Sequence, residues 1–279
     1  VVSAMGRMGE PYATDSLLEL IRQNGGVLSL RERDLLMACG ETISAAILCG
    51  TLQSRGIEAS VLTGAQAGIL TTNEFGNARI TEIRTERILS LLQEGKVAVV
   101  TGFQGVTADG DTTTLGRGGS DTTATALGAA LKAEFVDIFT DVEGVLTADP
   151  RIVGDARPLH RVSYQEICNM AYNGAKVIHP RAVEIAMHSD VPIRIRSTFS
   201  DSPGTLVAAP SVVRSGKVRD RLITGIAHST EVTQIQVSPT KDTDPFELQL
   251  RVFKAMAEHG ISVDLINVNP SGVAYTVQA

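Results

Sequence analysis

Residues 112–130 read TTTLGRGGSDTTATALGAA, and this stretch decides the fold. A β-branched strand leads into the turn Arg-Gly-Gly-Ser-Asp (117–121), and a helix of small residues follows. Glycines let the backbone approach a ligand closely, and the Ser or Asp of the turn is expected to cap the helix. Because free N–H groups at a helix start bind anions, the pattern indicates an anion site beside Arg117. The alternative is an ordinary turn whose glycines only satisfy backbone geometry.

The next strand supports the anion site. Residues 135–140, FVDIFT, are followed by Asp141 and by the loop VEGVLTADPR, which contains Asp149 and ends at Arg151. In an open parallel sheet, the loops after successive strands emerge at the carboxyl edge, where ligands bind. We therefore expect both loops to meet at one edge of a single parallel sheet.

Composition excludes several classes of protein. The chain has 279 residues, 43% of them hydrophobic, which is enough for a core and for more than one domain. A net charge of -6 without any basic run argues against a nucleic-acid partner. Three scattered cysteines without a C-x-x-C pair fit a reducing cytoplasm, and neither they nor the five unclustered histidines form a transition-metal site. We see no apolar run of membrane-spanning length and no secretory signal, so we expect a cytoplasmic protein without a membrane partner.

Both ends of the chain fall inside strand-like runs. The first residues, VVSAMG, read as the second half of a buried strand without an initiating methionine, and the last, YTVQA, lie within another strand. We therefore expect a fragment that lacks sequence at both ends.

Apolar runs alternate with helical patterns through about residue 210. This alternation indicates βα units, a mostly parallel sheet and helices on both faces. The expected strands are 59–63, 96–102 and 192–197, and the expected helices are 14–22, 30–54, 84–94, 163–174 and 180–188.

The C-terminal part has a different pattern. Residues 211–224 are the expected linker between a domain of residues 1–210 and a second domain of residues 225–279. In the second domain, a strand at 234–237 precedes a helix that Asp244 caps and Gly260 ends, and two more strands follow. The order βαββ is most of a ferredoxin-like module without its last helix and strand.

The polar loops point to phosphate chemistry outside the common nucleotide motifs. The sequence has no G-x-x-x-x-G-K-[ST], no protein-kinase motif set and no G-x-G-x-x-G. Arg117, Arg151 and Lys176 could neutralise phosphate together with a bound Mg²⁺, and Asp121 or Asp141 could lie near the metal or orient the acceptor. Two plainer alternatives are open, namely that Arg151 pairs with a nearby carboxylate and that Lys176 is a solvated turn residue.

Glu41 lies among apolar helix residues in CGETISA. A buried carboxylate needs a cationic partner, which here is either a structural cation or the ammonium group of a ligand. No Ser-His-Asp or Cys-His arrangement is readable. A carboxylate acceptor is already ionised at neutral pH, so a kinase acting on one needs no strong general base.

Seven motifs in order resemble those of aspartokinases of the monofunctional bacterial type, within the amino-acid kinase superfamily. They are VVSAMG (1–6), CGET (39–42), TGFQG (101–105), TLGRGGSDTTA (114–124), TDVEGVLTADPR (140–151), GAKVIHP (174–180) and VPIRIRST (191–198). The resemblance covers essentially the whole chain. Its βαββ part resembles the first half of a regulatory ACT pair.

The resemblance implies a three-layer α/β/α sandwich with a mostly parallel sheet, the amino-acid kinase fold, plus a partial ferredoxin-like ACT module. It implies transfer of phosphate from ATP, with Mg²⁺, to L-aspartate, giving 4-phospho-L-aspartate on the route to lysine, diaminopimelate, threonine and methionine. The implied substrate contacts are Ser3, Thr14, Glu41, Arg117 and Ser120, and the implied catalytic residues are Arg117, Ser120, Asp121 and Lys176. The implied nucleotide contacts are Gly118, Gly119, Thr140, Asp141, Leu146, Asp149, Arg151 and Lys176.

Three features depart from the family pattern. A strand carrying Lys-Phe-Gly-Gly-Thr-Ser would precede Val1, Leu146 stands where many members have tyrosine, and the second ACT module is absent. The resemblance still implies a homo-oligomer formed through ACT modules and inhibition by lysine, threonine or meso-diaminopimelate, with Asp264 and Asn269 as candidate effector contacts. Two alternatives are another amino-acid kinase, for glutamate or acetylglutamate, and a non-catalytic regulatory or oligomerisation fragment.

Overall fold

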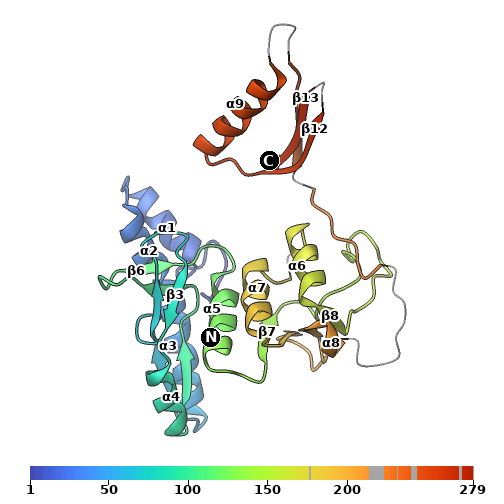
Figure 1. Ribbon diagram of the computed structural model, residues 1–279. Helices are drawn as coiled ribbons and strands as arrows, with labels where there is room; N and C mark the ends of the chain where they lie inside the picture. Colours follow the sequence, from blue (N-terminus) through green and yellow to red (C-terminus); the bar gives the residue numbers. More distant parts are fainter. Residues whose placement is uncertain (176, 214–222, 231, 240–243, 270–271, 279) are drawn as a thin grey trace. The chain divides into compact units, whose positions relative to one another are not determined.

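The computed structural model has two compact units, Val1–Ala227 and His228–Ala279 (Figure 1). It describes residues 1–175, 177–213, 223–230, 232–239, 244–269 and 272–278. The sequence predicts a first domain that ends at residue 210 and a second that begins at residue 225, whereas the first unit of the structure extends to Ala227. The α/β class predicted for the first unit and the antiparallel sheet predicted for the second are both confirmed.

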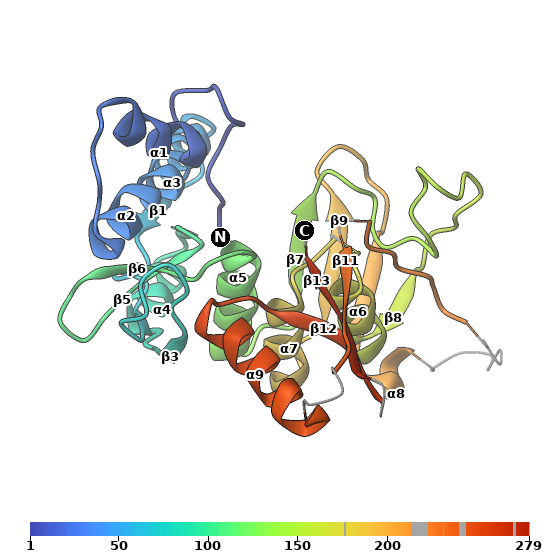
Figure 2. The ribbon, with the colours of Figure 1, turned by 90° about the horizontal axis from the view of Figure 1, so that it is seen from above.

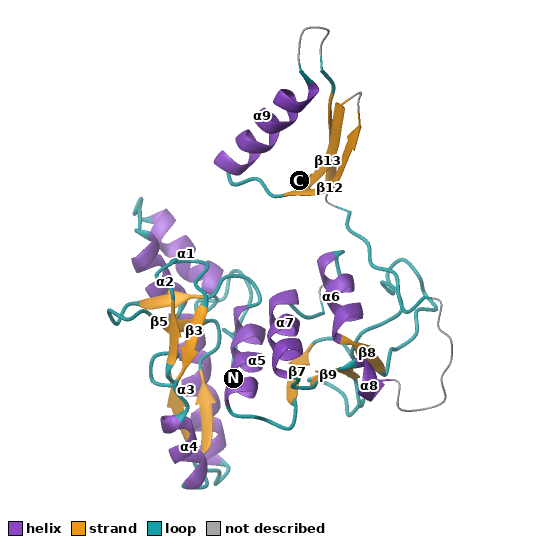
Figure 3. Ribbon diagram, viewed as in Figure 1, coloured by secondary structure: helices purple, strands orange, loops and turns teal. Residues whose placement is uncertain are grey.

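The first unit alternates helices with short strands (Figure 3). Its helices are α1 (Thr14–Gln23), α2 (Leu30–Met37), α3 (Cys39–Ser54), α4 (Glu86–Gln93), α5 (Gly119–Ala130), α6 (Tyr164–Tyr172), α7 (Pro180–Ser189) and α8 (Pro210–Val213). Its strands are β1 (Ala59–Leu62), β2 (Ile69–Thr71), β3 (Ile80–Ile83), β4 (Val97–Val100), β5 (Gln104–Val106), β6 (Thr112–Thr114), β7 (Val136–Thr140), β8 (Arg161–Ser163), β9 (Ile193–Ser197) and β10 (Thr205–Ala208).

The parallel pair β1–β4 has helices on both faces. Alternate side chains of a strand point to opposite faces, so each strand contributes to two apolar layers. On one face, Ala59 and Val99 pack with Ala45 and Cys49 of α3. On the other face, the cluster consists of Leu62, Val100, Ile88 of α4 and Leu127 of α5, with Ala67 and Ile69. This part of the unit is therefore the three-layer arrangement expected from the sequence.

Strand β6 does not share a sheet with β7, contrary to the expectation from the sequence. The four-stranded sheet β3-β2-β5-β6 contains β6, whereas β7 belongs to the sheet β7-β9-β10-β8. Gln104 pairs with Thr114 in an antiparallel register, because a short turn joins β5 to β6. A parallel arrangement would need a longer crossover connection.

The sheet β7-β9-β10-β8 carries the largest core cluster of the unit. Ile193 and Ile195 of β9 are fully buried, and α6 and α7 contribute apolar side chains to the same cluster. Helix α5 lies beside α7 (Figure 1, Figure 2). The predicted capping box of α6 is present, since Ser163 and Glu166 exchange hydrogen bonds between their side chains and backbones.

Residues 30–54, expected as one helix, form two helices that meet at Ala38. By length and composition this run of 25 residues could cross a membrane, since an 18-residue window within it has a mean hydropathy of 1.7, and one-third (33%) of that window is buried. The expectation that no apolar run has such a length is therefore wrong. In the folded unit, Asp34 and Glu41 of this run are buried and bonded to other segments, and α3 packs on β1 and β4. These contacts make the run a packed helical layer of the first unit.

The second unit contains β11 (Val232–Val237), α9 (Pro245–Glu258), β12 (Val263–Asn269) and β13 (Gly272–Gln278). The strands form an antiparallel sheet in the order β11-β13-β12, as the βαββ pattern predicts. Asp244 caps α9 by accepting a hydrogen bond from the N–H of Phe246. The rings of Phe253 and Tyr275, 5.9 Å apart, join the helix to the sheet.

Candidate active site

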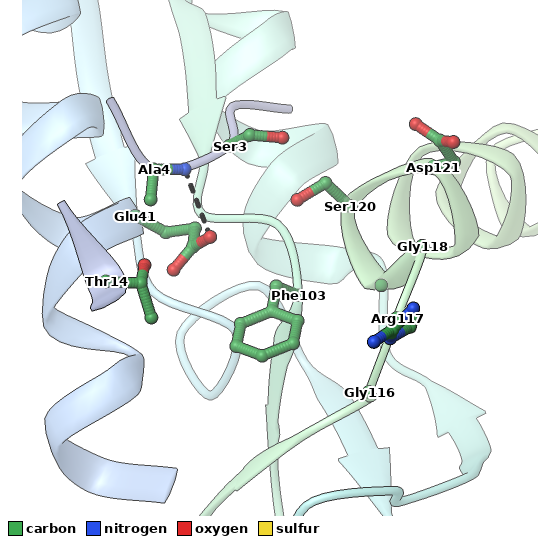
Figure 4. A pocket seen from close by; sticks show the side chains of 11 residues that line it. Ser3, Ala4, Thr14, Glu41, Phe103, Gly116, Arg117, Gly118, Ser120 and Asp121 are labelled. Atoms are coloured by element: carbon green, nitrogen blue, oxygen red, sulfur yellow. Dashed lines mark hydrogen bonds between the residues drawn. The ribbon is translucent and has the colours of Figure 1, made fainter. Parts of the chain in front are cut away.

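A cavity of about 330 Å³ lies in the first unit, at the low end of the range of roughly 300–1,000 Å³ typical of small-molecule sites. Figure 4 shows Thr14 and Glu41 on one side of it and Arg117 and Ser120 on the other. The lining residues are Ser3, Ala4, Thr14, Glu41, Phe103, Gly116, Arg117, Gly118, Gly119, Ser120 and Asp121. The cavity thus collects all the predicted substrate contacts.

The first wall depends on Gly40. A Cβ atom at this position would lie 2.8 Å from the Cβ of Ala4 and 2.9 Å from the Oγ1 of Thr14, closer than real contacts allow. The glycine therefore lets the segment after Val2 and the start of α1 approach α3. This close approach places the backbone of Ala4 and the hydroxyl of Thr14 beside Glu41 in the first turn of α3.

Glu41 is a buried carboxylate with one unused oxygen. Only 5% of the surface of this residue is exposed to solvent. Its Oε1 accepts a hydrogen bond from the N–H of Ala4 at 3.0 Å, whereas Oε2 has no partner among the described residues. Burial raises the pKa of Glu41 to about 7, although the N–H groups of Ala4 and of Glu41 itself oppose the rise. No structural cation pairs with Glu41 in the described part of the chain, so the ammonium group of a ligand is the alternative that fits.

The second wall is the loop between β6 and α5. Gly118 has a φ of 67°, and a Cβ atom there would lie 2.1 Å from the Cγ of His179, so only glycine fits. This left-handed residue starts the helix, and α5 has no side-chain cap. The prediction that Ser120 or Asp121 caps the helix is therefore wrong, because both residues already lie in its first turn. Asp121 instead accepts a hydrogen bond through Oδ2 from the N–H of His179 at 3.4 Å.

The uncapped helix start offers free donors. Among the described residues, the N–H groups of Ser120 and Asp121 and the guanidinium of Arg117 have no hydrogen-bond partner. Backbone N–H groups at a helix start and an adjacent arginine favour the binding of an anionic group. The cavity therefore offers an acceptor for a cation on one wall and donors for an anion on the other.

Phe103 also lines the cavity, and sequence reasoning missed it. Its φ of 67° is uncommon for a residue with a side chain, and its N–H donates to the Oγ1 of Thr123 at 3.1 Å. The absence of a side chain at Gly119 makes room for the ring, because a Cβ atom there would lie 2.6 Å from the ring. The available signal was the position of Phe103 between two glycines in TGFQG, which suggests an unusual backbone. Ala4 and Gly116 were missed too.

The predicted nucleotide contacts after β7 lie outside this cavity lining. Thr140 ends β7 and donates a hydrogen bond to Asp141 at 3.2 Å. Leu146 pairs with Pro158 in an isolated bridge further along the loop. Lys176, predicted as a catalytic and nucleotide-binding residue, lies outside the described residues. These nucleotide assignments stay predictions.

Arg151 makes an ion pair with Asp149, as one of the alternatives from the sequence suggests. The Nη2–Oδ2 distance is 2.7 Å, and the Arg151 side chain is 87% exposed. An exposed pair of this kind contributes little to stability, so the guanidinium can exchange partners at little cost.

The candidate effector residues Asp264 and Asn269 lie on β12 in the second unit, and both are exposed. The Oδ1 of Asp264 accepts a hydrogen bond from the N–H of Leu265 at 2.8 Å. Their predicted role stays a prediction.

Comparison with known proteins identifies the family. The amino acid kinase family matches residues 1–197. Aspartokinase 1 of Bacillus subtilis is 58% identical over 278 residues, which are 99% of this chain and 68% of that protein. The structure of Escherichia coli aspartokinase III with aspartate and ADP (R-state) matches with a TM-score of 0.78 and 32% identity, over 95% of this chain and 59% of that one. The same enzyme with lysine and aspartate (T-state) matches with a TM-score of 0.74 and 31% identity, over the same shares.

The chain therefore spans about three-fifths to two-thirds of the length of these relatives. The family match covers more than half of the chain, and more than half of the aligned residues are identical in the Bacillus subtilis protein. A cavity with an acceptor for a cation on one wall and donors for an anion on the other agrees with this assignment. The chain belongs to the amino acid kinase family and, within it, to the aspartokinases.

Proposed function

We propose that this chain carries the acceptor site of an aspartate kinase, which transfers the γ-phosphoryl group of ATP to the side-chain carboxylate of L-aspartate. The observation that carries the proposal is a pair of groups in one cavity, Oε2 of Glu41 and the guanidinium of Arg117, that have no partner among the residues the structure describes. An α-amino acid supplies a partner for each. The structure of the Escherichia coli relative with aspartate and ADP supports the same ligands.

In this proposal, Glu41 binds the ammonium group of aspartate and Arg117 binds its α-carboxylate. Ser3 and Thr14 contribute hydroxyl groups from the wall that holds Glu41. Fixing both ends of the backbone of the amino acid directs its side chain toward the rest of the site.

Ser120 and Asp121 lie at the start of α5, where the free N–H groups favour negative charge. We assign these residues to the junction between the aspartate side chain and the γ-phosphate. The remaining nucleotide contacts in this proposal are Gly118, Gly119, Thr140, Asp141, Leu146, Asp149, Arg151 and Lys176.

The metal proposed with ATP is Mg²⁺. No group of three or more His, Cys, Asp and Glu side chains that could hold a metal occurs in the described part of the chain. A site with few carboxylates is still compatible with Mg²⁺ that arrives bound to ATP. That ion usually needs only one or two protein carboxylates, and phosphate oxygens and water complete its coordination. Asp121 or Asp141 would supply such a carboxylate, and the ion would neutralise phosphate charge.

The transfer needs positioning more than proton chemistry. The acceptor carboxylate is ionised at neutral pH, so its oxygen attacks the γ-phosphorus without a general base. The bond to the β-phosphate oxygen breaks, and ADP leaves with that electron pair. In this proposal, the donors at the start of α5 offset the negative charge on the transferring group, which is the main requirement of such a step.

The second unit has a separate proposed role. We assign it to the formation of a homo-oligomer and to the binding of an inhibitory amino acid, lysine, threonine or meso-diaminopimelate, with Asp264 and Asn269 as contacts. The Escherichia coli relative solved with lysine supports an amino-acid effector. We propose that the enzyme acts in the cytoplasm.

Trapping of the acyl phosphate with hydroxylamine tests the reaction. The polypeptide that carries this chain is incubated with ATP, Mg²⁺, hydroxylamine and either L-aspartate or L-glutamate, and the hydroxamate is measured. We expect a signal with aspartate alone, a much weaker signal in Arg117→Ala, and an unchanged signal in Arg55→Ala, which replaces an exposed arginine outside the cavity lining. A signal with glutamate alone, or none from folded protein that binds ATP, would contradict the proposal.

A further inference from the structure

Arg181, in the first turn of α7, binds two distant carbonyl groups. Its Nη1 donates to the carbonyl oxygen of Leu115, and its Nη2 donates to that of Ala78, both at 2.9 Å. Leu115 and Ala78 are fully buried, so water cannot replace the guanidinium as their donor without entering the core. Arg181 does not line the cavity.

Asp34 of α2 holds the same two segments through their N–H groups. Its Oδ2 accepts hydrogen bonds from the N–H of Thr114 at 2.7 Å and from the N–H of Gly76 at 2.8 Å, and its Oδ1 accepts one from the hydroxyl of Thr114 at 2.9 Å. Asp34 is fully buried and also lies outside the cavity lining. One anionic and one cationic side chain therefore fix the segments 76–78 and 114–115.

Leu115, the last residue that these hydrogen bonds reach, lies two residues before Arg117. The N–H of Leu115 also donates to the carbonyl oxygen of Phe103 at 2.8 Å, which ties the start of the loop to another cavity residue. At the far side of the loop, His179 contacts Gly118 and donates through its N–H to Asp121. Between these anchors, Arg117 is exposed and its side chain has no partner among the described residues, so its place depends on the backbone beneath it.

We propose that Arg181 and Asp34 are positioning residues that hold the loop 114–119 so that Arg117 faces the substrate carboxylate. This inference rests on the proposed function, because it concerns the same acceptor site. Neither residue touches the substrate. Asp34 accepts hydrogen bonds from backbone N–H groups, and Arg181 donates hydrogen bonds to backbone carbonyl groups, that have no such partner within the loop itself.

The forked shape of the guanidinium is essential to the argument. Two of its N–H groups reach two carbonyls that belong to different segments, whereas a lysine offers a single point of donation. Arg181→Lys should therefore keep the charge and one bond but release one segment. Arg181→Met keeps the apolar stem and releases both.

The control is Arg31→Met. The Nε of Arg31 donates to Asp111 at 2.8 Å, and Asp111 lies in the turn that joins β5 to β6, at the other end of β6 from the loop. The control therefore removes an ion pair from the same hairpin without touching Thr114 or Leu115.

Kinetics of the polypeptide that carries this chain test the proposal. We expect Arg181→Met to raise the KM for aspartate at least tenfold and the KM for ATP by a smaller factor, with Arg181→Lys in between. Arg31→Met should leave both values within twofold. An unchanged KM for aspartate, or a fall in kcat alone, would overturn the proposal, since a smaller fraction of folded protein lowers kcat and leaves KM unchanged.

Hydrogen exchange gives a second readout that does not need activity. A peptide covering residues 113–120 should exchange at least tenfold faster in Arg181→Lys and Arg181→Met than in the parent, while a peptide covering β7 should be unchanged. Unchanged exchange in 113–120 would overturn the proposal. A parent protein without aspartate kinase activity would contradict the proposed function instead, and the exchange experiment would still decide whether Arg181 holds the loop.

Discussion

Binding of aspartate at pH 7 should release about half a proton from Glu41. In the free protein, burial raises the pKa of this side chain to about 7, so about half of the molecules carry the proton at that pH. An ammonium group beside the carboxylate favours its ionised form and lowers its pKa, so binding expels the remaining proton. By the same reasoning, the release should be about 0.9 protons at pH 6 and about 0.1 at pH 8.

Isothermal titration calorimetry measures this release directly. Titrations of aspartate at one pH in buffers with different enthalpies of ionisation give an observed enthalpy whose slope against those enthalpies is the number of protons exchanged. Glu41→Gln is the matched control, because it keeps the shape of the side chain but cannot titrate. It should bind aspartate more weakly and show no release.

The same pKa predicts a loss of stability with rising pH in the absence of ligand. The folded protein holds its proton on Glu41 up to about pH 7, whereas the unfolded chain loses it near pH 4.5. Stability therefore falls between these values, by about 3 kcal/mol at about 1.4 kcal/mol per pKa unit. Unfolding by urea across this range should show a decrease that is about 3 kcal/mol smaller in Glu41→Gln than in the parent. No proton release between pH 6 and 8, together with aspartate binding by Glu41→Gln as tight as by the parent, would refute the assignment of Glu41 as the partner of the ammonium group.

Two further substitutions test the loop before α5. Arg117→Ala should lower kcat/KM for aspartate on the order of 10- to 100-fold without changing the melting temperature, because the exposed side chain has no protein partner among the described residues to lose. A variant with full activity would contradict the assignment to the α-carboxylate. Gly118→Ala should destabilise the protein by about 1–2 kcal/mol from its left-handed φ alone, and more where the new methyl group meets His179. Thermal unfolding measures this, and an unchanged melting temperature would show that the loop can move aside.

Long periodic segments were predictable from the sequence. Helices α1, α3, α5, α7 and α9 follow their predicted limits within a few residues, apart from the division at Ala38. Strands β2 and β5 were missed, because ILT and QGV have only three residues each and show no measurable alternation. The direction of β6 was missed for a related reason, since nothing in the sequence marked β5 as its hairpin partner.

The site residues that could be predicted from the sequence are charged side chains whose sequence neighbours are apolar residues or glycines. Glu41 among apolar helix residues and Arg117 between glycines each conflict with their local surroundings, and such conflicts can be read from the sequence. Phe103 also lies between glycines, but it carries no charge that would mark it as part of a polar site, so it was missed. Arg181 and Asp34 were missed because their partners are backbone groups between 42 and 103 residues away, and backbone groups look alike in every sequence.

The arrangement of the cavity gives a physical reason for its unpartnered groups. A fold that stabilised itself fully would pair the buried carboxylate of Glu41 with a cation of its own, yet the structure leaves an acceptor on one wall and donors on the other. A buried carboxylate such as Glu41 costs stability unless a ligand supplies its missing partner. A ligand with both an ammonium and a carboxylate completes both walls, whereas a dicarboxylate without the ammonium leaves Glu41 protonated or uncompensated. Selectivity for an amino acid thus follows from polar groups that the described part of the protein leaves without partners, and it depends on the side chains that position those groups, such as Arg181, as well as on those that face the substrate.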